Sequence, residues 1–171
     1  LPIAMIPNCA ATRHIHFSLD GTGPANFDPP PLDSWPKLDN QINTGIRKVD
    51  LDKVTRDEIK QWKSGERLLL SGKLLTGRDA AHKKISELIE RQEDLPGEVN
   101  FTNRFIYYVG PVDPVGNEVV GPAGPTTATR MDKYTDTMLN HTGLLGMIGK
   151  AERGPNTIEA LQRHKSVYLI A

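Results

Sequence analysis

Three basic side chains follow glycine-bearing turns in this sequence, and their type and placement suit the binding of an anion. Arg78 and Lys150 each come directly after a glycine, and Arg130 follows the glycine- and proline-rich stretch 121–125. Guanidinium and ammonium groups donate charge-assisted hydrogen bonds to carboxylates and phosphates, so three of them around one pocket would bind a small di-anion such as a dicarboxylate or a phosphate ester. Each basic residue taken alone is also explained as a solvated surface charge, and this simpler interpretation stays open at this point.

The stretch 121–150 brings several of these groups together in sequence. Thr126 or Thr127 is predicted as the N-cap of a helix, because a hydroxyl there accepts hydrogen bonds from free backbone N–H groups. Arg130 is predicted in the first or second turn of that helix, where a positive charge opposes the helix dipole. One use of this arrangement is to bind an anion, which free N–H groups, two hydroxyls and a guanidinium would surround. The alternative is that Arg130 is exposed to solvent without a ligand.

Apolar periodicity predicts the helices and strands that position these groups. One helix follows the turn in 121–150, because its apolar residues recur at helical spacing: Met131, Tyr134, Thr135, Met138 and Leu139. The other elements are predicted as helices within 55–62 and 80–92 and after Pro155, and as strands within 49–54, 67–70, 73–75, 104–109, 144–148 and 167–171.

Capping signals mark the start of two of these helices. Thr55 and Glu58 form a capping box, in which a hydroxyl and a carboxylate each satisfy a free N–H group. Pro155 suits the first position of a helix, since its fixed φ fits the helix and its missing N–H is not needed there. The face of that helix that carries Ile158 and Leu161 is predicted to point inward.

The order of these elements predicts the fold class. Strands that alternate with helices indicate an α/β domain with at least some parallel pairing, here expected as a mixed sheet with flanking helices. In open α/β sheets, ligands bind at the carboxyl ends of the strands. Arg78, Arg130 and Lys150 are therefore expected to gather at one edge of the sheet.

The first part of the chain differs in composition from the rest. Residues 20–46 are dominated by glycine, proline, asparagine and aspartate, which predicts a long irregular connection. We therefore expect an N-terminal arm and linker over 1–46 and a compact α/β domain over 47–171. The chain starts without Met in an apolar run and stops in the strand-like VYLIA, so it is expected to be a fragment of a longer protein.

Composition excludes several functional classes. The 21 Lys and Arg residues balance the 21 Asp and Glu residues, which argues against non-specific electrostatic binding to nucleic acid or to an anionic membrane. No apolar run approaches the length of a membrane span. The single cysteine, Cys9, excludes an internal disulfide and fits a reducing compartment, so a cytoplasmic location is expected. Without a CxxC partner, Cys9 is by itself explained as a buried apolar thiol.

Four motifs, in order along the chain, resemble one known family: LLTGRDAAHK (74–83), IYYVGP (106–111), GPAGPTTATRMD (121–132) and MIGK (147–150). They are similar to the C-terminal domain of class I, iron–sulfur fumarate hydratases, and to the related β subunit of L(+)-tartrate dehydratase. PNCAATRH (7–14) resembles the end of the preceding domain of single-chain class I fumarases. The resemblance covers nearly the whole chain and implies a swivelling β/β/α fold.

The resemblance implies a hydro-lyase of the tricarboxylic acid cycle that reversibly hydrates fumarate to L-malate. Members carry a [4Fe–4S] cluster held by three cysteines, with one iron open to substrate oxygen. Cys9 matches the third of these ligands, which replaces the interpretation of Cys9 as a structural thiol. The other two cysteines belong to an N-terminal domain that is missing from this sequence, so the fragment alone is expected to be cluster-free and inactive. Family members are dimers.

The same matching implies roles for individual residues. Arg78 and Arg130 are similar to the clamps on the substrate carboxylates, and Lys150 is similar to a lysine that completes the charge match. Thr126 is similar to the residue proposed to remove the C3 proton, and it needs a partner carboxylate from the missing domain because threonine is a poor base unaided. The substrate-binding segment implied by the resemblance comprises Thr126, Thr127, Ala128, Thr129 and Arg130.

Two other hypotheses remain open. The same basic clamp would serve a dehydratase of another hydroxy-diacid, such as tartrate or a methylated malate. A free-standing carboxylate-binding module without chemistry is the third possibility, and a reading frame without two further cysteines ahead of Leu1 would favour it.

Overall fold

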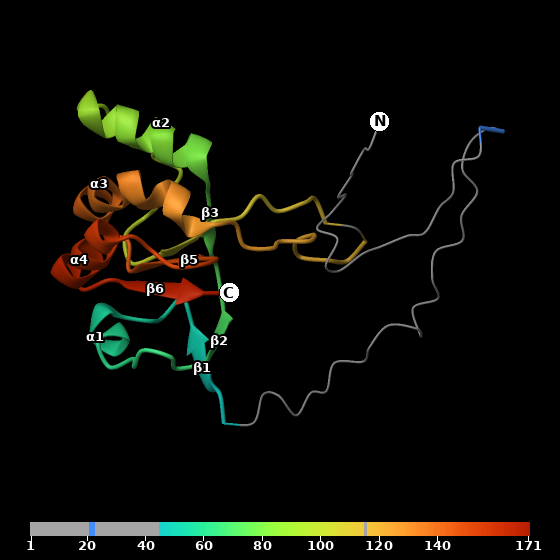
Figure 1. The fold of residues 1–171 in the computed structure, drawn as a ribbon, viewed down its shortest axis with the longest axis horizontal. Coiled ribbons are helices and arrows are strands. Elements are labelled where there is room, and N and C mark those ends of the chain that lie inside the picture. The colour runs from blue at the N-terminus through green and yellow to red at the C-terminus, as the bar shows by residue number, and fades with distance from the viewer. Residues whose placement is uncertain (1–20, 23–44, 115) are drawn as a thin grey trace. The chain divides into compact units, whose positions relative to one another are not determined.

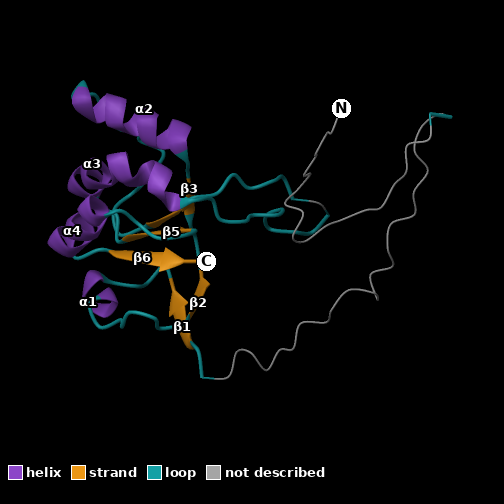
Figure 2. Cartoon of the chain, in the orientation of Figure 1, coloured by secondary structure: helices purple, strands orange, loops and turns teal. Residues whose placement is uncertain are grey.

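The computed structural model describes residues 21–22, 45–114 and 116–171 (Figure 1). Cys9 and the predicted N-terminal arm lie outside these residues, except for Gly21, Thr22, Gly45 and Ile46, so the predicted boundary near residue 46 stays a prediction. The chain divides into two units, of which one contains 45–111 and 123–171 and the other contains 112–122. Every helix and strand described below belongs to the first unit (Figure 2).

The centre of this unit is a four-stranded sheet in the order β3-β4-β5-β6. Its strands are β3 (Leu75–Thr76), β4 (Phe105–Tyr107), β5 (Gly146–Gly149) and β6 (Val167–Ile170). All three pairings are parallel, with Thr76 beside Tyr107 and Tyr107 beside Ile148. The carboxyl ends of the strands therefore lie at one edge of the sheet.

A second, two-stranded sheet precedes the first along the chain. It consists of β1 (Arg47–Asp50) and β2 (Leu68–Ser71), which are also parallel, and the short helix α1 (Arg56–Ile59) connects them. The capping signal at this helix is confirmed on its hydroxyl side, because Thr55 Oγ1 accepts a hydrogen bond of 3.2 Å from the backbone N of Glu58.

Three helices pack against one face of the four-stranded sheet: α2 (Asp79–Glu90), α3 (Asp132–Thr142) and α4 (Pro155–His164) (Figure 1). The core on this face combines strand residues with the buried faces of these helices. Its members include Ile106 and Met147 from the sheet, Tyr108 just beyond β4, Ile85 from α2, Met138 and Leu139 from α3, and Ala160 and Leu161 from α4.

The opposite face of the four-stranded sheet packs against the two-stranded sheet, β1–β2. Phe105 and Ile148 point to this side and share one core cluster with Val49, Leu51 and Ile59. Because successive side chains of a strand point to opposite faces, the run Phe105–Tyr108 contributes alternately to the two cores. This two-sided burial explains why the sequence of β4 is apolar without interruption.

The α/β prediction is confirmed, and several details of it are corrected. Every pairing among the described strands is parallel, so no antiparallel partner of a mixed sheet occurs in this part of the chain. The prediction that Ile158 faces inward is wrong, because this residue is 48% exposed while Ala160 and Leu161 are buried. The inward face of α4 also includes Thr157, which a purely apolar pattern cannot identify.

The helix predicted after the turn at 121–125 begins later than expected. A 3-10 helix, η3 (Ala128–Met131), comes first, and α3 follows it directly from Asp132. The apolar spacing is nevertheless confirmed, since Met131, Thr135, Met138 and Leu139 are buried. In the described residues, no helix combines the length and apolar character that a membrane crossing requires.

Candidate functional site

Arg78 lies at the carboxyl end of β3 and is the N-cap residue of α2. The backbone N of Gly77 donates a 3.1 Å hydrogen bond to the carbonyl of Tyr107, which holds this turn against β4. The guanidinium of Arg78 lies against Gly110, where an added Cβ would be 3.3 Å from Cζ of the arginine. A residue without a side chain at position 110 therefore allows the exposed guanidinium to lie close against the backbone three positions beyond β4.

The backbone of Thr126 is held between the ends of two strands. Its N donates a 2.8 Å hydrogen bond to the carbonyl of Tyr108, just beyond β4. Its carbonyl accepts a 3.0 Å bond from the backbone N of Lys150, just beyond β5, and Ala128 N donates back to the carbonyl of Lys150 at 2.9 Å. Thr127 and Lys150 thus form a parallel bridge that extends the sheet at its carboxyl edge.

The side chain of Arg130 reaches back over this bridge. Its Nη2 donates a 3.0 Å hydrogen bond to Oγ1 of Thr126, and the same nitrogen lies 3.6 Å from Oδ2 of Asp79. Both partners of the ion pair are about half exposed, with side-chain exposures of 52% and 47%, so the pair orients Arg130 rather than adding much stability. Asp79 is a site residue that the sequence reasoning missed, although it directly follows Arg78.

The four predicted groups therefore lie at a single edge of the sheet. Arg78 follows β3, Lys150 follows β5, and Thr126 with Arg130 lies across the ends of β4 and β5. Thr127 is the N-cap residue of η3, as predicted, but its side chain forms no capping bond, and α3 has Met131 at its N-cap. The hydroxyl of Thr126 accepts from Arg130 instead of from a backbone N–H group.

The remaining residues of the predicted substrate segment differ in exposure. Thr127 and Thr129 are exposed at the surface of the turn. Ala128 is completely buried and its N–H group is already bonded to Lys150, so it can support the turn but presents no group to a ligand.

Buried polar residues lie directly beneath this edge. His82 is 1% exposed, and its Nδ1 donates a 2.8 Å hydrogen bond to the carbonyl of Arg78. Burial lowers the pKa of His82, which favours the neutral imidazole. The ring of Tyr108 meets that of His82 edge to face at 5.3 Å, and burial raises the pKa of Tyr108 to about 12. Burial therefore favours the neutral form of both side chains.

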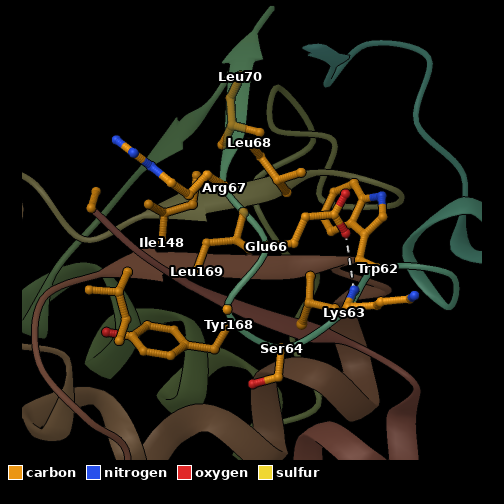
Figure 3. Close-up of a pocket in the computed structure, with 14 residues that line it drawn as sticks. Trp62, Lys63, Ser64, Glu66, Arg67, Leu68, Leu70, Ile148, Tyr168 and Leu169 are labelled. Carbon is orange, nitrogen blue, oxygen red and sulfur yellow. Dashed lines mark hydrogen bonds between the residues drawn. The ribbon is translucent and has the colours of Figure 1, made fainter. Parts of the chain in front are cut away.

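A sizeable cavity lies elsewhere in the same unit. It has a volume of about 760 Å³ and is bounded by β2, β6 and the loop 62–67, as the side chains in Figure 3 show. The carboxylate of Glu66 at its wall accepts a 3.1 Å hydrogen bond from the backbone N of Lys63. None of the predicted site residues lines this cavity. The candidate site therefore stays at the sheet edge, since an exposed anion site at strand ends needs no deep cavity.

Cys9, the predicted cluster ligand, lies outside the described residues. In the part of the chain that the structure describes, no group of three or more histidine, cysteine or acidic side chains is arranged to hold a metal ion. A thiolate-bound cluster takes several cysteines, and the whole sequence contains one. The residues of this chain alone therefore do not fit a complete cluster site.

Parallel sheets with flanking helices define an α/β domain, and the carboxyl edge of its larger sheet carries the candidate residues. The particular family follows from comparison with known proteins. A family model of the fumarase C-terminus matches residues 21–171, and the chain belongs to this family.

The relatives of the chain are consistent with this family. The chain is 33% identical over 175 residues to fumarate hydratase 2 of Leishmania major, with 98% of the chain but 30% of the relative covered. It is 32% identical over 174 residues to the anaerobic class I fumarate hydratase of Escherichia coli K12, with 98% of the chain and 31% of the relative covered. A putative L(+)-tartrate dehydratase subunit beta of Methanocaldococcus jannaschii is 32% identical over 122 residues, which cover 70% of the chain and 62% of the relative. The chain thus spans about a third of the length of these two fumarate hydratases.

Proposed function

We propose that this chain is the C-terminal, substrate-binding part of a class I fumarate hydratase, which reversibly adds water to fumarate to give L-malate. The observation that carries the proposal is the gathering of Arg78, Arg130, Lys150 and Thr126 at one sheet edge, within a domain of the fumarase C-terminal family. Three cations match a doubly negative acid, and the hydroxyl is the uncharged group among them.

The proposed mechanism uses the cations to hold and orient the substrate. Arg78 and Arg130 bind the two carboxylates, because a planar guanidinium donates two parallel hydrogen bonds to a carboxylate. Lys150 adds a third positive charge that stabilises the negative charge developing when a proton leaves C3 of malate. Fixing both ends of the acid lowers the entropic cost of bringing C3 to the base. Thr127 and Thr129 line the same segment, and Ala128 supports its backbone.

Thr126 is proposed to remove the C3 proton of malate as the C2–O bond breaks and hydroxide leaves. In the hydration direction, hydroxide adds to C2 and Thr126 returns the proton to C3. A hydrogen bond from the guanidinium of Arg130 to Oγ1 stabilises the deprotonated oxygen relative to the hydroxyl. This bond also leaves the hydroxyl proton of Thr126 free to point to another acceptor, because Oγ1 accepts from Arg130. A carboxylate from the preceding domain is the proposed acceptor, so the complete site forms between two domains.

The remaining ligands and partners are proposed from the family resemblance. A [4Fe–4S] cluster would be held by Cys9 together with cysteines of a preceding domain, since this chain supplies a single thiolate. The single cysteine also supports a reducing compartment, so we propose a cytoplasmic enzyme of the tricarboxylic acid cycle. A homodimer is proposed for the full-length protein, and light scattering would measure it.

Activity of the full-length protein tests the proposed function. The protein, reconstituted anaerobically with iron and sulfide, is expected to convert fumarate and L-malate into each other. Absence of this conversion in a protein with an intact cluster would contradict the proposal. The similarity to the putative tartrate dehydratase subunit favours a second candidate, a dehydratase of L(+)-tartrate, with the same clamp. The kcat/KM values for malate and tartrate, measured in parallel, decide between the two substrates.

The close approach of Arg78 to Gly110 gives a specific prediction. A Gly110→Ala change adds a Cβ at 3.3 Å from Cζ of Arg78, which displaces the guanidinium by a few tenths of an ångström. We expect KM for fumarate to rise about 3- to 10-fold, since small misplacements of a positioning group weaken substrate binding. Gly97→Ala is the matched control, because a Cβ at position 97 meets no atom within 4 Å. Equal KM values for the two variants would show that Arg78 does not bind substrate in this position.

A further inference from the structure

Arg153 is a charged residue buried beneath the candidate site. Its side chain is 2% exposed, and it lies three positions after Lys150 and just before α4. Nε donates a 2.6 Å hydrogen bond to Oδ1 of Asp132, and Nη2 donates a 2.6 Å bond to Oγ1 of Thr135. Nη1 lies 3.5 Å from the hydroxyl of Tyr108. Such burial is costly for a charge unless it is paired and hydrogen-bonded, and this guanidinium is both.

One set of contacts links Arg153 to the segment that carries Arg130. Asp132 is the first residue of α3 and directly follows η3, which contains Arg130. Its second oxygen, Oδ2, accepts a 2.7 Å hydrogen bond from the backbone N of Gly154. The carboxylate therefore ties the start of α3 to the start of α4, with the guanidinium between them.

A second set of contacts runs through Tyr108. Cζ of Arg153 lies 5.4 Å from the centre of the Tyr108 ring, which is completely buried. The carbonyl of the same tyrosine accepts the 2.8 Å hydrogen bond from the backbone N of Thr126. The cation thus fixes the ring of the residue whose carbonyl holds the threonine in place.

A third set of contacts reaches Lys150. Cζ of Arg153 lies 4.9 Å from the centre of the Tyr168 ring, and the hydroxyl of Tyr168 donates a 2.8 Å bond to the carbonyl of Ala151. Ala151 directly follows Lys150 and has a φ of 66°, a left-handed conformation that a residue with a Cβ adopts at a cost. The tyrosine bond therefore holds the backbone next to Lys150 in a conformation that it would not favour alone.

We propose that Arg153 is a positioning residue that sets the backbone beneath Thr126, Arg130 and Lys150 through Tyr108, Asp132 and Tyr168. It does not touch the substrate. The expected effect of Arg153 on turnover rests on the proposed function. Its expected effect on the backbone rests on the hydrogen bonds of the described residues. A guanidinium suits this place because one planar group directs three nitrogens at different partners, whereas a lysine presents a single nitrogen.

Arg153→Lys in the full-length protein tests the proposal. We expect kcat for fumarate to fall at least about 10-fold in folded enzyme with an intact cluster, because the base and its cations lose alignment. The matched control is Arg163→Lys, which changes an exposed arginine that bonds Asp136 at 2.6 Å between the same two helices. Unchanged kcat in Arg153→Lys, or an equal loss in both variants, would overturn the proposal.

A double-mutant cycle separates positioning from general weakening of the fold. If Arg153 acts through Thr126, Arg153→Lys has a smaller effect on kcat once Thr126 is already alanine. We expect the fold-loss of kcat in the Thr126→Ala background to be at least about 5-fold smaller than in the wild-type background. If the fold-losses of kcat in the two single variants multiply in the double variant, Arg153 stabilises the fold without positioning the base. That result would overturn the proposal.

Amide hydrogen exchange gives a readout that does not depend on activity. The amides of Thr126 and Lys150 are expected to exchange about 10-fold faster in Arg153→Lys, while amides in α2 keep their rates. If Arg153→Lys does not fold, Thr135→Val removes one acceptor of the guanidinium and should accelerate the same two amides to a smaller degree. Unchanged exchange at both amides overturns the proposal. A wild-type protein without hydratase activity would contradict the proposed function, and the exchange measurement would still decide the role of Arg153.

Discussion

Replacing Arg130 with alanine is expected to lower kcat/KM for fumarate about 100- to 1000-fold in the full-length enzyme, which corresponds to about 3–4 kcal/mol of transition-state stabilisation. The side chain has two proposed tasks, so both kinetic constants should change. Loss of the carboxylate clamp raises KM, and loss of the 3.0 Å bond to Oγ1 of Thr126 lowers kcat. Steady-state kinetics with fumarate and with malate measure both effects.

The structure offers a graded variant and a control for this prediction. Arg130→Lys keeps the charge but loses the planar fork, so we expect a loss between that of the alanine variant and that of the wild type. Arg91→Ala removes an exposed arginine at the far end of α2 and should leave kcat/KM within about twofold, as surface changes away from a site usually do. A loss of less than about 5-fold in Arg130→Ala would refute the proposed clamp, because one charge-assisted bond accounts for more than that.

The gathering of the site could be predicted from sequence because it depends on topology. Arg78 and Lys150 follow short apolar strands, and parallel strands place their carboxyl ends at one edge. The pattern also predicted the buried face of η3 and α3 through Met131, Met138 and Leu139. Both inferences use local periodicity plus one general rule of sheet topology. The roles of these residues in catalysis stay predictions, since the geometry shows their proximity alone.

The local geometry of the threonines could not be predicted in the same way. A threonine whose hydroxyl caps a helix and a threonine whose hydroxyl bonds a side chain look the same in a sequence. Which of these bonds forms depends on where the helix begins. Here the bridge between Thr127 and Lys150 keeps the backbone extended, so that η3 starts at Ala128 and α3 starts at Asp132. The carbonyl of Lys150 lies just beyond β5, more than twenty positions further along the chain, and no pattern within 121–132 indicates it.

Arg153 was missed for a related reason. In the sequence it lies between Glu152 and Gly154 in a polar stretch, which favours an exposed charge. Its burial arises because Asp132, Tyr108 and Tyr168 come from three other elements and converge on it. Tertiary contacts of this kind leave no periodic signal. Ile158 shows the opposite error, since an apolar residue at helical spacing remains 48% exposed.

Removing the partner of Arg153 should lower the stability of this domain strongly. Asp132→Ala leaves a guanidinium with a 2% exposed side chain without its carboxylate, and it also removes the acceptor of Gly154 N. Breaking a buried ion pair from one side costs about 3–5 kcal/mol, because the remaining charge stays desolvated and unpaired. At roughly 2–4 °C per kcal/mol for a domain of this size, the melting temperature should fall by about 10 °C. Calorimetric melting of the full-length protein, in which the transition of this domain is followed, measures the shift.

Two further variants distinguish this electrostatic cause from a simple loss of packing. Asp136→Ala removes the partner of Arg163 in an ion pair whose side chains are 61% and 54% exposed, and should cost less than about 1 kcal/mol. In the double variant Asp132→Ala with Arg153→Met, no unpaired charge remains, so its melting temperature should exceed that of Asp132→Ala alone. If the double variant is less stable than the single one, the cost arises from the packing of Arg153 between Tyr108 and Tyr168 and not from its unpaired charge.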